Sequence, residues 1–405
     1  MNSKAYNPLW AYREAIRAAA TRWQKRGLLS AAQLTFVLAA YPLDYYRPNI
    51  FLRITLFVFT LIGLSAGSGF VGLFVHDAFD SYGSDEALVI ATGVLSVLAG
   101  LLLLEFAIKD SRLYHSGIDN ALLYYTLGWT ICLVVYTVYE LAPEGYRHAD
   151  SLTSPYVVTT LLLVLPVLLA ATVRYADRLV AAAAHLTYLL LLASVLLQFP
   201  IGRLVLPFVV MLASAAAYVL IKQFTQRPDY LYYKPCLQVL KVLSLATFYL
   251  GGNYLVVREG NALLSDAVVS TQIPFAWLFY FFTAGIPIVY VVVGLRRHDR
   301  IWLLVGLVLM AFSVYTLRHY RSVLPPEIAA TLVGAMLIAA MLWVTHYLRA
   351  PRHGLTTAAE EDEDERKFNL ESLVVAQTAN VPQPAEAGFE FGGGSSGGGG
   401  AEGSY

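Results

Sequence analysis

Charged residues are scarce in this sequence. Only 14% of its 405 residues are Asp, Glu, Lys or Arg, whereas 58% are hydrophobic, and the mean hydropathy is +0.59. Soluble domains carry roughly 25% charged residues. A soluble chain of this length cannot bury so much apolar surface, because the buried fraction levels off as chains grow. The composition therefore excludes an ordinary soluble protein and predicts an integral membrane protein.

The sequence also has no net charge and few cysteines. The formal net charge is zero, so no overall basic field favours a nucleic-acid partner, and we predict none. The two cysteines, Cys132 and Cys236, form no CxxC motif and have no metal-ligand spacing. This excludes a disulfide framework, and we interpret both residues as small buried hydrophobic side chains.

Two motifs of soluble enzymes are absent, the phosphate-binding GxxxxGK[ST] and the zinc-binding HExxH. We accordingly predict no catalytic residue, no cofactor and no metal ligand. The absence argues against an enzyme without excluding one.

Long apolar runs are what the sequence does contain. Most are near the roughly 20 residues that an α-helix needs to cross a bilayer. They are continuous and rich in Leu, Val and Ala, unlike the alternating strands of a barrel. The fold class predicted is all-α, a polytopic membrane bundle of about ten transmembrane helices within residues 50–348. The predicted runs are 50–75, 87–108, 119–141, 155–173, 179–198, 202–222, 236–257, 273–295, 301–317 and 327–348.

Lys and Arg alternate between the loops. The first 49 residues hold seven of them, whereas the first loop on the opposite side has none. The loops expected on the N-terminal side carry Lys109, Arg112, Arg174, Arg178, Lys222, Arg227, Lys234, Arg296, Arg297, Arg300, Arg349 and Arg352. Those on the other side carry Arg147, Arg203, Arg258, Arg318 and Arg321. Because cytoplasmic loops are enriched in Lys and Arg, both termini are predicted to be cytoplasmic in an inner or plasma membrane.

Residues 1–49 and 349–405 differ from the apolar runs. Residues 8–26 have the spacing of an amphipathic helix, Gly27 is suited to end it, and Ser30 is suited to cap a second helix over 31–40. We predict a cytoplasmic helical hairpin. Residues 349–405 combine an acidic run with a Gly/Ser-rich stretch and are predicted to be a disordered cytoplasmic tail.

The N-terminal hairpin carries a resemblance. Its pattern is Trp23-x-x-Arg26-Gly27-Leu28-Leu29-Ser30-x-x-Gln33, followed by Tyr41-Pro42 and a Gly- and Ser-bearing apolar run. It resembles the start of a family of uncharacterised bacterial multi-pass membrane proteins with a cytoplasmic helix–turn–helix. The motif covers about a tenth of the chain. The resemblance implies a bacterial inner-membrane protein and no particular activity.

Four polar residues lie within apolar runs, where burial is costly. Glu105 has Lys109 four residues on, which suits a salt bridge near the interface. Lys241 can extend to the headgroups. His185 is either a proton relay or ligand, or a helix-packing residue. Asn253 follows two glycines, which mark either a broken helix that binds a solute or close helix packing.

Two short turns between apolar runs also resemble each other. Arg174–Arg178 and Arg296–Arg300 each contain one Asp, Asp177 and Asp299. Either Asp is suited to cap the helix that follows it. The likeness fits an internal duplication or the convergence of short cytoplasmic turns.

Three classes of function remain open. A transporter or channel for a small solute is favoured by the helix number and the buried polar residues. The alternative is a non-catalytic membrane sensor or scaffold that recruits a cytoplasmic protein through the hairpin or the tail. A membrane-embedded lipid-processing enzyme has least support. The lipid bilayer is the one partner that the composition itself implies, and the oligomeric state is left open.

Overall fold

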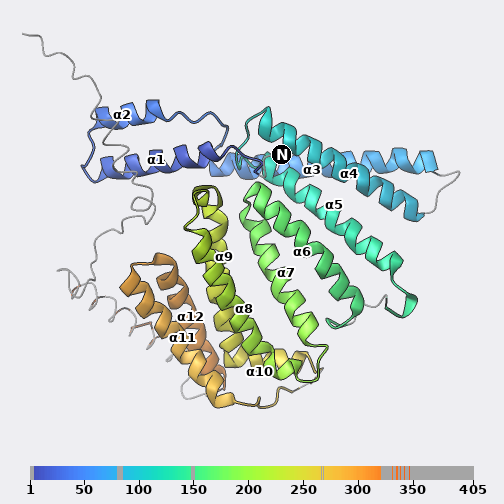
Figure 1. Cartoon of the computed structure of the whole chain (residues 1–405), viewed down its shortest axis with the longest axis vertical. Helices are drawn as coiled ribbons and strands as arrows, with labels where there is room; N and C mark the ends of the chain where they lie inside the picture. The colour runs from blue at the N-terminus through green and yellow to red at the C-terminus, as the bar shows by residue number, and fades with distance from the viewer. Residues whose placement is uncertain are drawn as a thin grey trace, which may run out of the picture. The chain divides into compact units, whose positions relative to one another are not determined.

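The computed structural model describes residues 4–79, 85–146, 151–265, 267 and 269–320, together with residues 331, 334, 335, 338, 342 and 346. Within these residues the chain forms α-helices, one 3₁₀ turn (Glu144–Tyr146), and an isolated bridge between Tyr46 and Leu113, with no strand (Figure 1). The all-α prediction is confirmed.

Among the described residues, nine helices are long and apolar enough to cross a membrane. They correspond to nine of the ten predicted runs, and the tenth, 327–348, falls almost entirely outside the described residues. The chain is therefore a multi-pass integral membrane protein. The nine are α3 (Ile50–Phe79), α4 (Asp85–Lys109), α5 (Ile118–Leu141), α6 (Pro155–Tyr175), α7 (Arg178–Leu196), α8 (Gly202–Phe224), α9 (Tyr230–Gly252), α11 (Ala276–Arg297) and α12 (Arg300–Tyr320).

One predicted run has the wrong bounds. Residues 236–257 are not a single helix, because α9 starts earlier, at Tyr230, and ends at Gly252. A separate short helix, α10 (Tyr254–Leu263), follows and lies roughly crosswise to α9 (Figure 1). Hydropathy alone extends the run across the junction, since Tyr254 to Val257 are also apolar.

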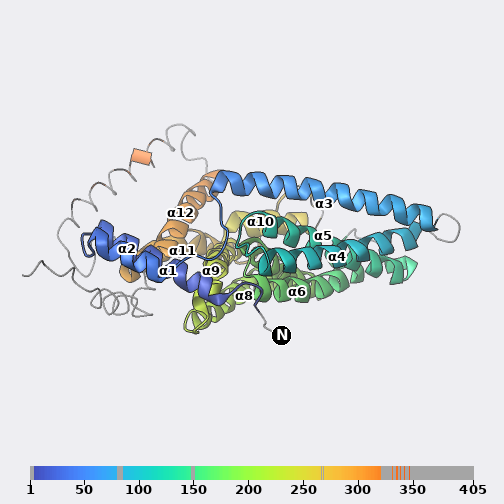
Figure 2. The same cartoon turned by 90° about the horizontal axis from the view of Figure 1, so that it is seen from above.

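Sequential helices pack in pairs joined by short turns. The closest pairs are α4 with α5, α6 with α7, α8 with α9, and α11 with α12. Helix α3 lies alongside α4 and α5 (Figures 1 and 2). At the α11–α12 contact a Cβ added to Gly294 would lie 2.7 Å from the backbone nitrogen of Leu303, so only glycine permits this approach.

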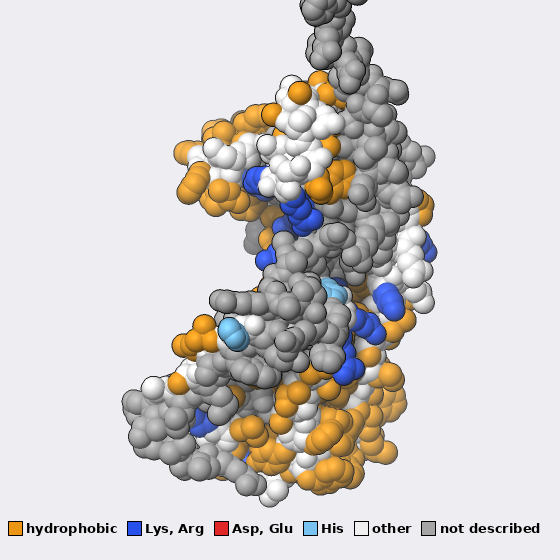
Figure 3. Space-filling model, turned by 90° about the vertical axis from the view of Figure 1, so that its left-hand side faces the viewer, with side chains coloured by type: hydrophobic (Ala, Val, Ile, Leu, Met, Phe, Trp, Pro, Cys, Tyr) orange, Lys and Arg blue, Asp and Glu red, His pale blue; other side chains and the backbone are white. Residues whose placement is uncertain are grey.

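Much apolar surface stays outside this packing. No residue in the most apolar part of α3 is buried, and large side chains such as Phe59, Leu102 and Trp277 are exposed. Figure 3 shows hydrophobic side chains covering the lower part of one face, with Lys and Arg gathered above them. This distribution suits a lipid environment bordered by a polar interface.

The chain divides into two compact units. One is formed by Met1–Tyr12 and Leu43–Glu360, and the other contains Arg13–Pro42. Helix α1 (Pro8–Lys25) continues from the first unit into the second, which also holds α2 (Ala31–Ala40). The predicted tail, 349–405, lies outside the described residues.

Within the second unit the expected hairpin signals are confirmed. Gly27 has φ +76°, and the Ser30 hydroxyl accepts from the backbone of Gln33 at 3.2 Å while the Gln33 side chain accepts from the backbone of Ser30 at 2.9 Å. This reciprocal arrangement is a capping box. Arg17 Nη1 donates to the carbonyl oxygen of Leu38 at 2.7 Å and joins the two helices.

Candidate functional site

The chain breaks its helical path at Asn253. This residue has φ −80° and ψ 127°, outside the helical region, and separates α9 from α10. Its side-chain Oδ1 accepts from the backbone nitrogens of Leu255 at 3.0 Å and Val256 at 3.2 Å. Asparagine is among the strongest N-cap residues, so it ends one helix and starts the next. The break that the sequence suggested is confirmed.

The break is also tied to the neighbouring helices. Asn253 Nδ2 donates to Tyr249 Oη at 2.8 Å and to Thr316 Oγ1 of α12 at 3.1 Å. The backbone nitrogen of Tyr254 donates to Thr283 Oγ1 of α11 at 2.9 Å. Non-helical backbone at membrane depth needs such partners because lipid supplies none.

The two glycines before the break serve close packing. A Cβ added to Gly251 would lie 3.0 Å from the carbonyl oxygen of Pro207 in α8, and one on Gly252 would lie 3.1 Å from Ile286 in α11. The two interpretations of Gly251–Asn253 therefore hold together, since the same segment packs tightly and breaks the helix.

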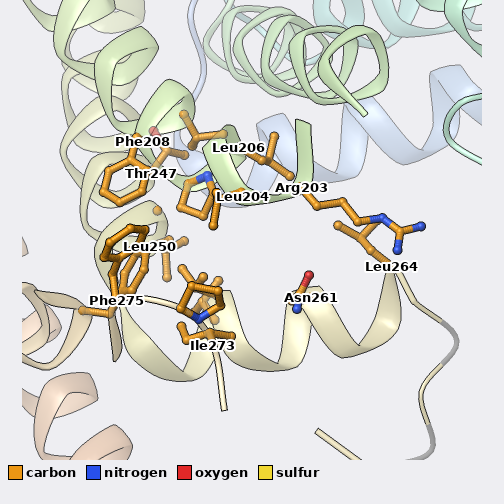
Figure 4. A pocket seen from close by; sticks show the side chains of 18 of the residues that line it. Arg203, Leu204, Leu206, Phe208, Thr247, Leu250, Asn261, Leu264, Ile273 and Phe275 are labelled. Carbon is orange, nitrogen blue, oxygen red and sulfur yellow. The ribbon is translucent and has the colours of Figure 1, made fainter. Parts of the chain in front are cut away.

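A cavity of about 460 Å³ lies beside the break. Its walls come from the start of α8, the end of α9, α10 and the segment before α11. They are mainly apolar, with side chains that include Leu204, Phe208, Leu250, Ile273 and Phe275 (Figure 4). Small-molecule sites commonly have such a volume and such walls, with a few polar groups that orient the ligand.

Three polar side chains lie in those walls, Arg203, Thr247 and Asn261. Arg203 extends from α8 toward Leu264, and Asn261 projects from α10 on the same side of the cavity (Figure 4). Arg203 Nη1 makes one long hydrogen bond, 3.4 Å, to Ser265 Oγ. A guanidinium has five N–H donors, so Arg203 can also donate to the acceptor of a ligand.

His185 approaches the cavity through Thr247. It is 6% exposed, and its Nε2 lies 3.4 Å from Thr247 Oγ1, which lies 2.8 Å from Ser214 Oγ. His185 does not itself line the cavity, whereas Thr247 and Gly251, one helical turn apart on α9, both do. The interior position expected for His185 and Asn253 is confirmed, and their role in binding stays a prediction.

Glu105 lies away from this cavity in a cluster of its own. Its Oε2 is 2.9 Å from Lys109 Nζ, the salt bridge that the sequence predicted. Arg174 of α6 adds a second ion pair through Nε at 3.1 Å, and Tyr175 Oη donates at 3.3 Å. These partners account for a carboxylate at this depth without a binding role.

The Lys241 side chain has a protein partner, whereas the sequence led us to expect that it extends to the lipid headgroups. It forms an ion pair with Asp299 in the α11–α12 turn rather than extending to the headgroups alone. Asp299 also caps α12, because its Oδ1 accepts from the backbone of Ile301 at 3.0 Å. Asp177 likewise caps α7 by accepting from Leu179 at 2.9 Å. Both predicted caps are confirmed.

Neither Glu105 nor Lys241 lines the cavity beside Asn253.

The sequence did not single out the residues that line the cavity. Arg203 resembles any basic residue in a short loop, and Asn261 lies in a stretch expected to be a connection.

The sequence analysis also did not identify a buried carboxylate at the other end of the bundle. Asp119 is fully buried and accepts from Tyr6 Oη and the backbone of His115, both at 2.7 Å. Its partners belong to the N-terminal segment and to the turn before α5, so Asp119 joins these two parts of the chain.

The sequence of α3 matches two enzyme motifs, but it lacks the local structure in which those motifs work. Residues 63–67 match GxSxG and residues 67–72 match GxGxxG. Both motifs work at a strand–turn–helix junction, whereas here they lie inside one continuous helix. Among the described residues no group of three or more His, Cys, Asp or Glu side chains is placed to hold a metal ion.

Comparisons of the chain with protein-family models, with curated proteins and with solved structures found no match.

Proposed function

We propose that the chain is a transporter or channel for a small solute, and that the solute binds in the cavity beside Asn253. The observation that carries this proposal is the placement of the cavity at a broken membrane helix. Broken helices recur at transport sites, because they expose backbone and side-chain polar groups inside an otherwise apolar bundle.

The chemistry of the walls supports one class of solute. Most of the surface is apolar, and the polar side chains at the Arg203 and Asn261 end include hydrogen-bond donors. Arg203 is always charged and presents a planar fork of N–H groups that matches carboxylates and related anions. The solute that fits is a small amphipathic anion, with its apolar body among Phe208, Leu250 and Phe275.

The predicted topology places this cavity toward the outside. Arg203 and Arg258 belong to the loops opposite the Lys- and Arg-rich side. Thr247 lines the cavity next to His185, and we infer that a solute passes it on the way toward the cytoplasmic side.

The scaffold alternative also has one supporting observation. Arg13–Pro42 forms part of a compact unit separate from the bundle, as a module for a cytoplasmic partner would. The sequence motif of the same hairpin is also the basis on which we propose that the chain belongs to the family of uncharacterised bacterial membrane proteins. Neither proposal accounts for a cavity at a helix break, so transport is preferred.

Transport is tested with hexanesulfonate in proteoliposomes. This probe has an apolar chain and a permanent negative charge, so it does not cross lipid as a neutral acid. We expect uptake above that of protein-free liposomes and a loss of about tenfold in Arg203→Gln, since a charge-assisted hydrogen bond contributes about 1.5–3 kcal/mol. The matched control is Lys222→Gln, at the opposite end of the same helix. Uptake equal to protein-free liposomes, or unchanged by Arg203→Gln, contradicts the proposed site.

A further inference from the structure

A second cavity lies at the opposite end of the helices from the break. Its volume is about 910 Å³, and its walls are much more polar than those of the first. They are formed by the N-terminal segment 4–10, by Asp44, and by residues at the ends of α4 and α6 and just before α9. Because α4, α6 and α9 are candidate spans, their common end lies at the depth of the lipid headgroups.

Cationic side chains outnumber carboxylates in these walls. Four are basic and two are acidic: Lys4, Lys109, Arg112, Arg174, Asp44 and Asp229. Lys4 Nζ is 2.9 Å from Asp229 Oδ2, and this hydrogen bond holds the pKa of Asp229 below its usual range. That acid is therefore charged and already matched by one of the four cations.

Arg112 is the basic residue of this cavity that can still pair with an anion. Lys109 and Arg174 are both paired with Glu105. Arg112 is exposed, has a left-handed backbone with φ +50°, and makes no ion pair in the part of the chain that the structure describes. Its five N–H donors are thus open to an anion that enters the cavity.

Trp10 adds an unpartnered hydrogen-bond donor to the residues that line this cavity. It lines the cavity, is 5% exposed, and packs against Tyr45 and Tyr114. Its indole Nε1 is buried and has no hydrogen-bond partner. A buried donor without a partner costs about 1–3 kcal/mol, and a ligand oxygen that reached Nε1 would remove that cost.

We propose that this cavity binds the phosphate-bearing headgroup of an anionic phospholipid. The phosphate lies between Arg112 and the Lys109–Arg174 side, where arginine can contact two oxygens at once. Trp10 Nε1 donates to a headgroup or ester oxygen, as tryptophan does at membrane interfaces. Basic pockets at the ends of membrane helices bind anionic headgroups through the same forces. The lipid then joins the N-terminal segment to the ends of three spans.

The test is lipid retention in native mass spectrometry. Full-length protein in micelles doped with phosphatidylglycerol should keep at least one phosphatidylglycerol molecule, while phosphatidylcholine at the same mole fraction is lost. Arg112→Gln should lower the phosphatidylglycerol-bound to free ratio about fivefold, the ratio that corresponds to about 1 kcal/mol for one basic residue at an anionic surface. Trp10→Phe, which keeps the ring and removes the N–H, should also lower it.

The control is Arg227→Gln. Arg227 stacks on Phe224 near the same end of the bundle and does not line the cavity. Equal retention in the Arg112→Gln and Arg227→Gln proteins overturns the proposal, as does equal retention of phosphatidylcholine. A separate arm adds inorganic phosphate to protein in lipid-free micelles. We expect no thermal stabilisation, and stabilisation by phosphate without retention of phosphatidylglycerol means a free-anion site and rejects the lipid.

Discussion

Asn253 and Thr316 are joined by hydrogen bonds across the helix break, with Asn253 Nδ2 3.1 Å from Thr316 Oγ1 and Thr316 Oγ1 3.3 Å from Asn253 Oδ1. Both residues are fully buried. The contact fixes α12 against the point where α9 ends, and so holds one side of the cavity in place.

The first prediction concerns this contact. Asn253→Ala removes the cap of α10 and leaves Thr316 and the backbone of Leu255 and Val256 without a partner. We expect a loss of about 2–4 kcal/mol of unfolding free energy, because a lost cap costs about 0.5–2 kcal/mol and buried unsatisfied groups cost about 1–3 kcal/mol. Thr316→Val should cost about 1 kcal/mol.

A double-mutant cycle checks the coupling between these residues. Unfolding of the detergent-solubilised protein is followed for both single variants and for the double variant. We expect the double variant to lose less than the sum of the two single losses. Strict additivity would show that Asn253 and Thr316 do not act as a pair.

The second prediction concerns Lys241 and Asp299. Lys241→Met leaves a carboxylate that is only 15% exposed without its cation, which should cost about 3 kcal/mol, the low end for a buried ion pair that loses one partner. Adding Asp299→Asn should recover most of this loss, because asparagine removes the charge and still caps α12. Thermal unfolding of the single and double variants measures both effects. A double variant less stable than Lys241→Met alone argues against the ion pair.

The third prediction concerns His115, which lies between α4 and α5. Burial lowers its pKa, with smaller opposing effects from Asp119 and Asp177, which raise the pKa, and from Arg47 and Arg178, which lower it. Below about pH 6.5 the unfolded chain binds a proton that the folded protein does not, so stability falls as the pH drops through this range toward the folded pKa.

His115→Asn should remove this part of the pH dependence. Asparagine tolerates the left-handed backbone that His115 adopts, φ +48°. The melting temperature of both proteins is measured from about pH 7.5 to about pH 5. We expect the wild-type protein to lose more than the variant on acidification, and parallel curves would assign the acid sensitivity to other groups.

The fourth prediction concerns topology. In a protein without Cys132 and Cys236, a cysteine at Ser151 should react with an impermeant thiol reagent added to intact cells. One at Ser111 should react only in inside-out vesicles. Both positions are exposed, so access depends on the side of the membrane. The reverse pattern would place the termini outside.

Features set by neighbouring residues were predictable from the sequence. Gly27, Ser30 and Asp177 end or cap helices through contacts within three residues, and hydropathy located the spans. The partner of Lys241 was not predictable, because Asp299 is 58 residues away and the choice depends on tertiary packing. The cavity combines segments from Leu189 to Phe279, and most of these are apolar stretches like the other spans, while α10 resembles a polar connection. Only the Gly251–Asn253 signal led toward it.

Access to Thr247 from both sides of the membrane tests the transport proposal most directly. Thr247→Cys, in the protein without Cys132 and Cys236, is treated with an impermeant maleimide in intact cells and in inside-out vesicles, with Ser151→Cys as the control that reacts from one side. A transporter or channel exposes its solute route to each side in turn or at once, so we predict labelling of Thr247→Cys in both preparations. Labelling in one preparation only would contradict transport through this cavity and favour the scaffold.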